Sequence, residues 1–114
     1  MILSIDYDDT YTRDPLFWNW VCEEAMKRGH DVWCVSARHN DYPMDEARQT
    51  IGRIIGADKC VGANGVAKRD HLFKTHGVYA DVWIDDMPDT VTVGYDVGEA
   101  GLWVPQYVGE GRGE

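Results

Sequence analysis

The stretch of sequence that decides the fold is ILSIDYDDTYT, residues 2–12. Its first part, Ile2–Ile5, is short and mostly apolar, which predicts a buried strand. Three carboxylates follow at once, at Asp6, Asp8 and Asp9. Burying a carboxylate is costly unless something pairs with it, and acids close together repel one another. This segment therefore either leaves the core for water or holds a cation.

Segments with the character of strands and of helices alternate along the rest of the chain. We expect strands at Ile2–Ile5, Asp31–Val35, Lys59–Gly62 and Ala80–Ile84, and helices at Pro15–Arg28, Pro43–Gly56 and Gly65–His76. Asp14 is placed to cap the first helix and Gly29 to end it. A short helix or turn is expected at Asp89–Val93, and a last strand at Leu102–Val104.

This alternation, with short connections, is typical of an α/β protein whose mostly parallel sheet is covered by helices on both faces. The length of 114 residues predicts one domain, with a Gly-rich tail over about 108–114 that we expect to be flexible. In parallel sheets of this kind, ligands bind beyond the carboxyl ends of the strands. The residues that follow each strand are therefore the first candidates for function.

Charge and cysteine content narrow the class of protein. Eleven basic and twenty acidic residues give a net charge of −9, which does not favour binding to long nucleic acid or to an anionic membrane. Cys22, Cys34 and Cys60 are far apart and show no metal-binding spacing, so we expect buried thiols in a reducing compartment. Without a signal peptide ahead of Ile2 or a membrane-length apolar run, the sequence predicts a cytoplasmic protein.

The strand ends carry an unusual set of side chains. Asp6, Asp8, Asp9 and Thr10 follow the first strand, Ser36-Ala37-Arg38 follow the second, Lys68 lies near the start of the third helix, and Asp85-Asp86 follow the fourth strand. Because these points should meet at one edge of the sheet, we expect carboxylates, a hydroxyl and two cations side by side. Magnesium takes carboxylate and phosphate oxygens, so a magnesium–phosphate site is predicted there.

In this order and at these structural positions, Asp6-x-Asp8-x-Thr10, Ser36, Lys68 and Asp85-Asp86 resemble the motifs of the haloacid dehalogenase (HAD) superfamily of phosphohydrolases. The resemblance covers Ile2 to about Thr90. It implies a three-layer Rossmann-like fold and a Mg²⁺-dependent phosphatase. The segments between the motifs are too short to hold the cap domain found in many relatives.

The resemblance also implies a role for each residue. Asp6 would be the nucleophile that forms an aspartyl phosphate, and Asp8 the general acid and then base, with its backbone carbonyl on the metal. Asp86, with Asp85 acting indirectly, would complete the metal site. Phosphoryl oxygens would be held by Thr10, Ser36, Ala37 and Lys68, with Lys74 as the rival lysine. Many relatives carry Gly where this chain has Asp9.

The segment Ser36-Ala37-Arg38 resembles the phosphatase domain of phage-type polynucleotide kinase-phosphatases, which implies that Arg38 contacts phosphate. Nucleotides or polynucleotide 3′-phosphate ends are therefore the first substrate class, with a phosphoprotein also open. Tyr11 and Tyr42 are the candidates for stacking a base, whereas Trp18 is expected in the core. A partner or the substrate itself would close the uncapped site.

Two other functions stay open. The first is a HAD-like protein that binds a partner without turnover. The second is a receiver-like phosphoacceptor module, but such modules carry the phosphorylated aspartate after the third strand. Here that position reads Gly62-Ala63-Asn64 and has no acid. The oligomeric state is left open by the sequence.

Overall fold

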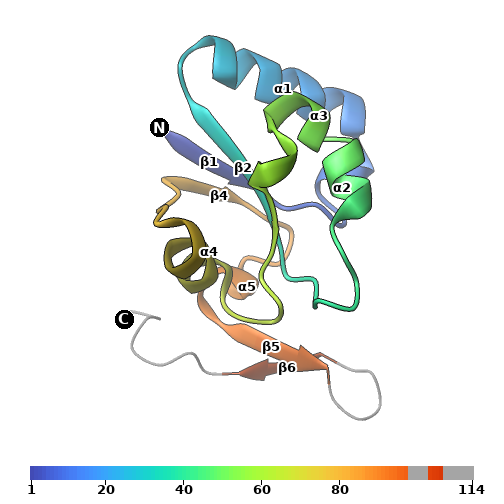
Figure 1. The fold of residues 1–114 in the computed structure, drawn as a ribbon, viewed down its shortest axis with the longest axis vertical. Helices are drawn as coiled ribbons and strands as arrows, with labels where there is room; N and C mark the ends of the chain where they lie inside the picture. The colour runs from blue at the N-terminus through green and yellow to red at the C-terminus, as the bar shows by residue number, and fades with distance from the viewer. Residues whose placement is uncertain (98–102, 107–114) are drawn as a thin grey trace.

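The computed structural model describes residues 1–97 and 103–106. Four strands form an all-parallel sheet in the order β3-β2-β1-β4 (Figure 1). They are β1 (Ile2–Ile5), β2 (Asp31–Ser36), β3 (Cys60–Gly62) and β4 (Val82–Ile84). The predicted α/β class and parallel sheet are confirmed.

The register of the sheet places β1 between β2 and β4. Ile5 pairs with Cys34 on one side and with Ile84 on the other. The pairing with β4 continues one residue further, where Asp6 N donates to Ile84 O at 2.9 Å. The chain runs outward from β1 through β2 to β3 and then returns to the far side of β1 as β4. This reversal places a topological switch point beside β1, where open α/β sheets form their ligand crevice.

Helices lie on both faces of this sheet (Figure 1). One face carries α1 (Pro15–Lys27), α2 (Asp45–Gln49) and α3 (Gly52–Ile55), and the other carries α4 (Lys68–His76) with α5 (Asp89–Thr92) beside it. Two short 3₁₀ segments, η1 (Tyr11–Arg13) and η2 (Ala57–Lys59), join the larger elements. Asp14 caps α1 as predicted, since its Oδ1 accepts from Phe17 N at 3.2 Å.

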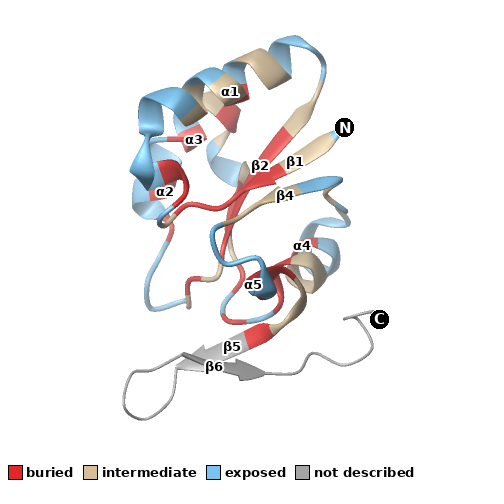
Figure 2. Ribbon diagram, turned by 180° about the vertical axis from the view of Figure 1, so that it is seen from behind, coloured by how far each residue is buried: buried red, intermediate tan, exposed pale blue. Residues whose placement is uncertain are grey.

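The alternation of side chains along β2 explains why both faces are covered. Val32 and Cys34 belong to an apolar cluster shared with the α1–α3 side, whereas Trp33 and Val35 pack with Leu72 of α4. A strand that buries both sets of side chains reads as a continuous apolar run rather than an alternating one. Figure 2 shows this strand as the buried centre of the molecule.

The prediction of one continuous helix over Pro43–Gly56 is wrong. The helix is interrupted at Thr50, so the segment forms two short helices, α2 and α3. Thr50 has φ −114° and ψ −93°, and its hydroxyl donates to Glu46 O at 2.7 Å. A side chain that bonds to the preceding carbonyls competes with the helical hydrogen bonds. A Cβ at Gly52 would lie 3.2 Å from both Ala47 O and Cys60 Sγ. The start of α3 therefore packs so closely against these atoms that a larger side chain would be crowded.

The third predicted helix begins at Lys68 rather than at Gly65. Asn64 and Gly65 have φ +54° and +77°, a left-handed turn that a helix cannot continue through. The turn is held by Asn64 N donating to Arg38 O at 2.9 Å and by Gly65 N donating to Ala37 O at 3.3 Å. It therefore ties the start of α4 to the loop after β2.

Past α5 the chain forms a separate two-stranded antiparallel sheet of β5 (Gly94–Val97) and β6 (Trp103–Gln106). The sequence predicted neither β5 nor this pairing. The predicted last strand overlaps β6, but its first residue, Leu102, and the tail 108–114 lie outside the described residues.

Cys22, Cys34 and Cys60 are all buried thiols without a disulfide. Among the residues that the structure describes, no helix combines the length and the apolar character needed to cross a membrane.

Candidate active site

A cavity of about 250 Å³ opens at the carboxyl ends of β1, β2 and β4. Its walls include ten of the residues singled out in the sequence and two more. They are Asp6, Asp8, Asp9, Ser36, Ala37, Arg38, Tyr42, Lys68, Asp85, Asp86, Met87 and Thr90. Residues from four separate parts of the chain thus meet at the edge of the sheet where the switch point lies.

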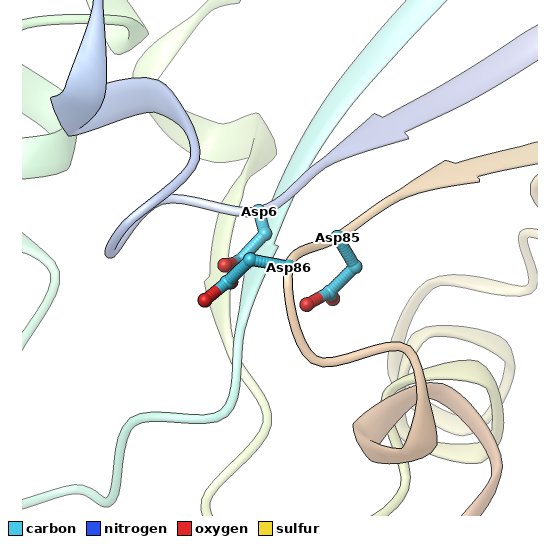
Figure 3. A group of neighbouring side chains, drawn as sticks. All are labelled: Asp6, Asp85 and Asp86. Atoms are coloured by element: carbon cyan, nitrogen blue, oxygen red, sulfur yellow. The ribbon is translucent and has the colours of Figure 1, made fainter.

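Three carboxylates form the acidic end of this cavity. Asp6, Asp85 and Asp86 each offer one oxygen, and these oxygens lie within 4.8 Å of one another. Figure 3 shows Asp6 leaving the end of β1, and Asp85 and Asp86 leaving the end of β4. Oxygen donors at such spacing are the ligands that hard divalent cations take. Asp8 is not among these three, because its side chain points to Arg38.

Lys68 is the cation of the acidic end. Its Nζ lies 2.8 Å from Asp6 Oδ1 and 2.5 Å from Asp85 Oδ2, and its side chain is only 2% exposed. As the first residue of α4, it enters the site directly after the left-handed turn at Gly65. The rival Lys74 is exposed in the last turn of α4 and does not line the cavity.

Within residues 1–97, the protein groups at the acidic end leave its negative charge unbalanced. Burial raises the pKa of Asp6 to about 7, although the ammonium of Lys68 opposes the rise; hydrogen bonding with Asp86 adds to it. Three carboxylates and one ammonium sum to −3 + 1 = −2 when all are ionised. A divalent cation would cancel this charge, so the donor set fits Mg²⁺ in both chemistry and charge.

Thr10 sits behind the carboxylates rather than in the cavity wall. Its Oγ1 lies 3.3 Å from Asp6 Oδ2 and 3.3 Å from Asp86 Oδ1, and it lines a neighbouring cavity of about 340 Å³. The sequence placed Thr10 among the residues that hold phosphate. In the structure its hydroxyl instead orients two of the acids.

Asp8 and Arg38 form the other end of the cavity. Arg38 Nε donates to Asp8 Oδ2 and Arg38 Nη2 to Asp8 Oδ1, both at 2.8 Å. Arg38 Nη2 also donates to Glu46 Oε1 at 2.6 Å, and Nη1 to Pro43 O at 2.9 Å. Arg38, expected to contact phosphate, is therefore engaged with Asp8 in this structure.

Ser36 and Ala37 lie in the cavity wall between the two ends. Ser36 Oγ accepts from Arg38 N at 3.2 Å, so its own proton is left for a ligand in the cavity. Asp9 has φ +63°, in the left-handed region that glycine, asparagine and aspartate tolerate best. An acid can therefore stand at this position, whose backbone conformation also favours glycine.

The two tyrosines proposed for base stacking have different outcomes. Tyr11 is 2% exposed, stacks on Tyr7 and donates to Asn19 Oδ1 at 2.7 Å, so its assignment as a stacking residue is wrong. Tyr42 is 56% exposed and lines the cavity, where its ring lies 4.0 Å from the Arg38 guanidinium carbon. Trp18 packs partly buried against the core, as predicted.

Sequence reasoning missed Glu46, Met87 and Thr90. Met87 and Thr90 belong to the turn after the two acids: Met87 N donates to Asp85 Oδ1 at 2.9 Å, and Thr90 Oγ1 to Met87 O at 2.7 Å. Their position just after Asp85-Asp86 is the sequence feature that could have predicted them. No sequence feature indicated Glu46, because its partner Arg38 reaches it across a loop.

Comparison of the chain with protein-family models, with curated proteins and with solved structures finds no match.

Proposed function

We propose that this chain is a Mg²⁺-dependent phosphomonoester hydrolase with a three-layer, uncapped HAD fold, working through an aspartyl phosphate. The observation that carries the proposal is the meeting of Asp6, Asp8, Lys68 and Asp86 in one cavity. They come from the ends of β1 and β4 and from the start of α4. The combination of a nucleophilic carboxylate, a second carboxylate, a cation and metal ligands is what phosphoryl transfer through an acyl phosphate needs.

Asp6, Asp85 and Asp86 would hold the magnesium ion, and the Asp8 carbonyl would join them. The bound ion would neutralise charge on the phosphoryl oxygens. Lys68, 2.8 Å from the Asp6 carboxylate, lies close enough to hold another phosphoryl oxygen beside the nucleophile. The Ser36 hydroxyl and the Ala37 backbone line the same wall and would orient the phosphoryl group.

The reaction has two steps. An Asp6 oxygen forms a bond to phosphorus while the bond to the ester oxygen breaks, and that oxygen takes a proton from Asp8. A water molecule then attacks the aspartyl phosphate and gives its proton to Asp8, which releases phosphate and restores the Asp6 carboxylate. Asp8 can serve both steps because, two residues beyond Asp6, it reaches the ester oxygen rather than the phosphorus.

For the substrate we propose a nucleotide or the phosphorylated end of a short oligonucleotide. Tyr42 supports this class, because its exposed ring beside the cavity offers a face on which a base could stack. The net charge of −9 opposes tight binding to long nucleic acid. A phosphoprotein remains an alternative for an uncapped cavity.

The test is hydrolysis of p-nitrophenyl phosphate, nucleotides and 3′-phosphorylated oligonucleotides with Mg²⁺. We expect Asp6→Asn to abolish turnover, since no bond to phosphorus can then form. Asp8→Asn should slow it by about 100-fold or more, in the range general acid–base groups contribute. Asp45→Asn is the matched control, because Asp45 is exposed on α2 and does not line the cavity.

Three outcomes separate the alternatives. Background rates of the parent on every substrate would contradict the enzyme and leave the HAD-like binding protein. A lasting acyl phosphate on Asp6 with little turnover would indicate a phosphoacceptor module instead. Turnover that survives Asp6→Asn would contradict the proposed nucleophile.

A further inference from the structure

The hydrogen bonds of Arg38 leave few N–H donors free to bind a phosphate. A guanidinium has five N–H groups. Four of them are used: two on Asp8, one on Glu46 and one on the Pro43 carbonyl. The single N–H that remains is on Nη1. A forked contact to phosphate needs two N–H groups side by side, so it would have to displace Asp8, Glu46 or Pro43.

The surroundings of Arg38 hold it in this arrangement. Its side chain is only 3% exposed, and its guanidinium carbon lies 4.0 Å from the Tyr42 ring centroid and 5.2 Å from that of Tyr7. Its backbone N–H is bound to Ser36 Oγ at 3.2 Å. The side chains of its two acidic partners, Asp8 and Glu46, are 45% and 59% exposed. The arginine is thus the fixed member of the group.

We propose that Arg38 is a positioning residue for Asp8 and not a phosphate ligand, and that Glu46 positions Asp8 through Arg38. The fork fixes both Asp8 oxygens, and so sets where the acid lies relative to the ester oxygen. Glu46 and the Pro43 carbonyl fix the arginine from the other side. This inference rests on the proposed function, because it concerns how Asp8 serves that reaction.

Two substrates distinguish a positioning role from phosphate binding. The p-nitrophenolate group leaves without receiving a proton, whereas the alkoxide of glycerol 3-phosphate needs one from Asp8. Glu46→Gln should lower kcat on glycerol 3-phosphate by about 10- to 100-fold, the range for residues that orient a reacting group. The loss on p-nitrophenyl phosphate should be several-fold smaller, because with this substrate Asp8 is needed only as the base of the second step. KM and inhibition by inorganic phosphate should change little.

Asp45→Asn is the matched control, because it removes the neighbouring α2 carboxylate, whose partner at 3.6 Å is Arg48. Asp45→Asn should leave kcat on both substrates unchanged. Arg38→Met should act in the same direction as Glu46→Gln and more strongly. Because that variant also removes a buried side chain and so lowers stability, Glu46→Gln carries the kinetic test.

An equal loss on both substrates, with weaker inhibition by inorganic phosphate, would overturn the inference and make Arg38 a phosphate ligand. A parent without turnover would overturn the proposed function instead. A double-mutant cycle in urea unfolding then decides whether Glu46 acts on Asp8. Asp8→Asn and Glu46→Gln should be non-additive with Arg38 present and additive with Arg38→Met; additivity in both would contradict the inference.

Discussion

The two ends of the cavity handle charge in different ways. The lysine cluster consists of Lys68 with Asp6, Asp85 and Asp86, and the arginine cluster of Arg38 with Asp8 and Glu46. In each, one buried cation is shared by two carboxylates. The acids that share Lys68 are themselves buried, with side chains 8% and 3% exposed, whereas those that share Arg38 are 45% and 59% exposed.

This difference in burial means that the lysine cluster needs a further cation, whereas the arginine cluster does not. The buried side chains of Asp6 and Asp85 are poorly screened by water and share one ammonium, so these two acids and the exposed Asp86 beside them favour a metal ion. The excess charge of the arginine cluster reaches solvent and needs no further partner. What the arginine cluster provides is geometry, because a planar guanidinium fixes both oxygens of a carboxylate.

The largest difference should appear when each cation is removed. Lys68→Met leaves two buried acids without their partner and should lower the free energy of unfolding by about 3–5 kcal/mol. Arg38→Met leaves two acids that already reach water, so it should cost less than Lys68→Met, chiefly through the lost hydrogen bonds and packing of the buried guanidinium. Urea unfolding followed by tryptophan fluorescence, in EDTA, measures both. Arg48→Met, at an exposed ion pair, is the control; equal losses at Lys68 and Arg38 would break the comparison.

Magnesium should stabilise the protein through the lysine cluster alone. At 100 times its dissociation constant it should raise the free energy of unfolding by about 2.7 kcal/mol. Asp86→Asn should remove most of this gain, because it deletes one of the three carboxylates, and Glu46→Gln should keep it. Thermal unfolding with and without Mg²⁺ measures the effect. A gain that survives Asp86→Asn would place the ion elsewhere.

A smaller effect concerns pH in the absence of metal. Burial raises the pKa of Asp6 from 3.8 to about 7, so the folded protein holds a proton there that the unfolded chain gives up. This contribution is fully present below about pH 4 and is lost as pH rises through about 7.

In EDTA, the stability of the parent relative to Asp6→Asn should therefore fall between pH 5 and pH 7.5. Urea unfolding of both proteins at the two pH values measures the difference. Asp45→Asn serves as the control at an exposed acid. A difference that is flat or rises with pH would show that Lys68 outweighs burial.

The strands were the most predictable part of the fold. A strand buried on both faces must be a short apolar run, and Ile2–Ile5, Asp31–Ser36 and Cys60–Gly62 were found within a residue of their limits. The helix expected over 43–56 was not continuous, because apolar spacing does not reveal that Thr50 bonds to carbonyls behind it or that Gly52 meets Cys60. The β5–β6 pair depends on contacts between segments that carry no distinctive pattern.

The sequence by itself determined which acids, hydroxyls and cations stand behind the strands, because parallel strands deliver their carboxyl ends to one edge. Only the tertiary structure decided how those groups pair: Lys68 with Asp6 and Asp85, Arg38 with Asp8 and Glu46, and Tyr11 with the core. Pairing depends on distances and burial between segments up to 62 residues apart, as for Lys68 and Asp6, and no local pattern records them.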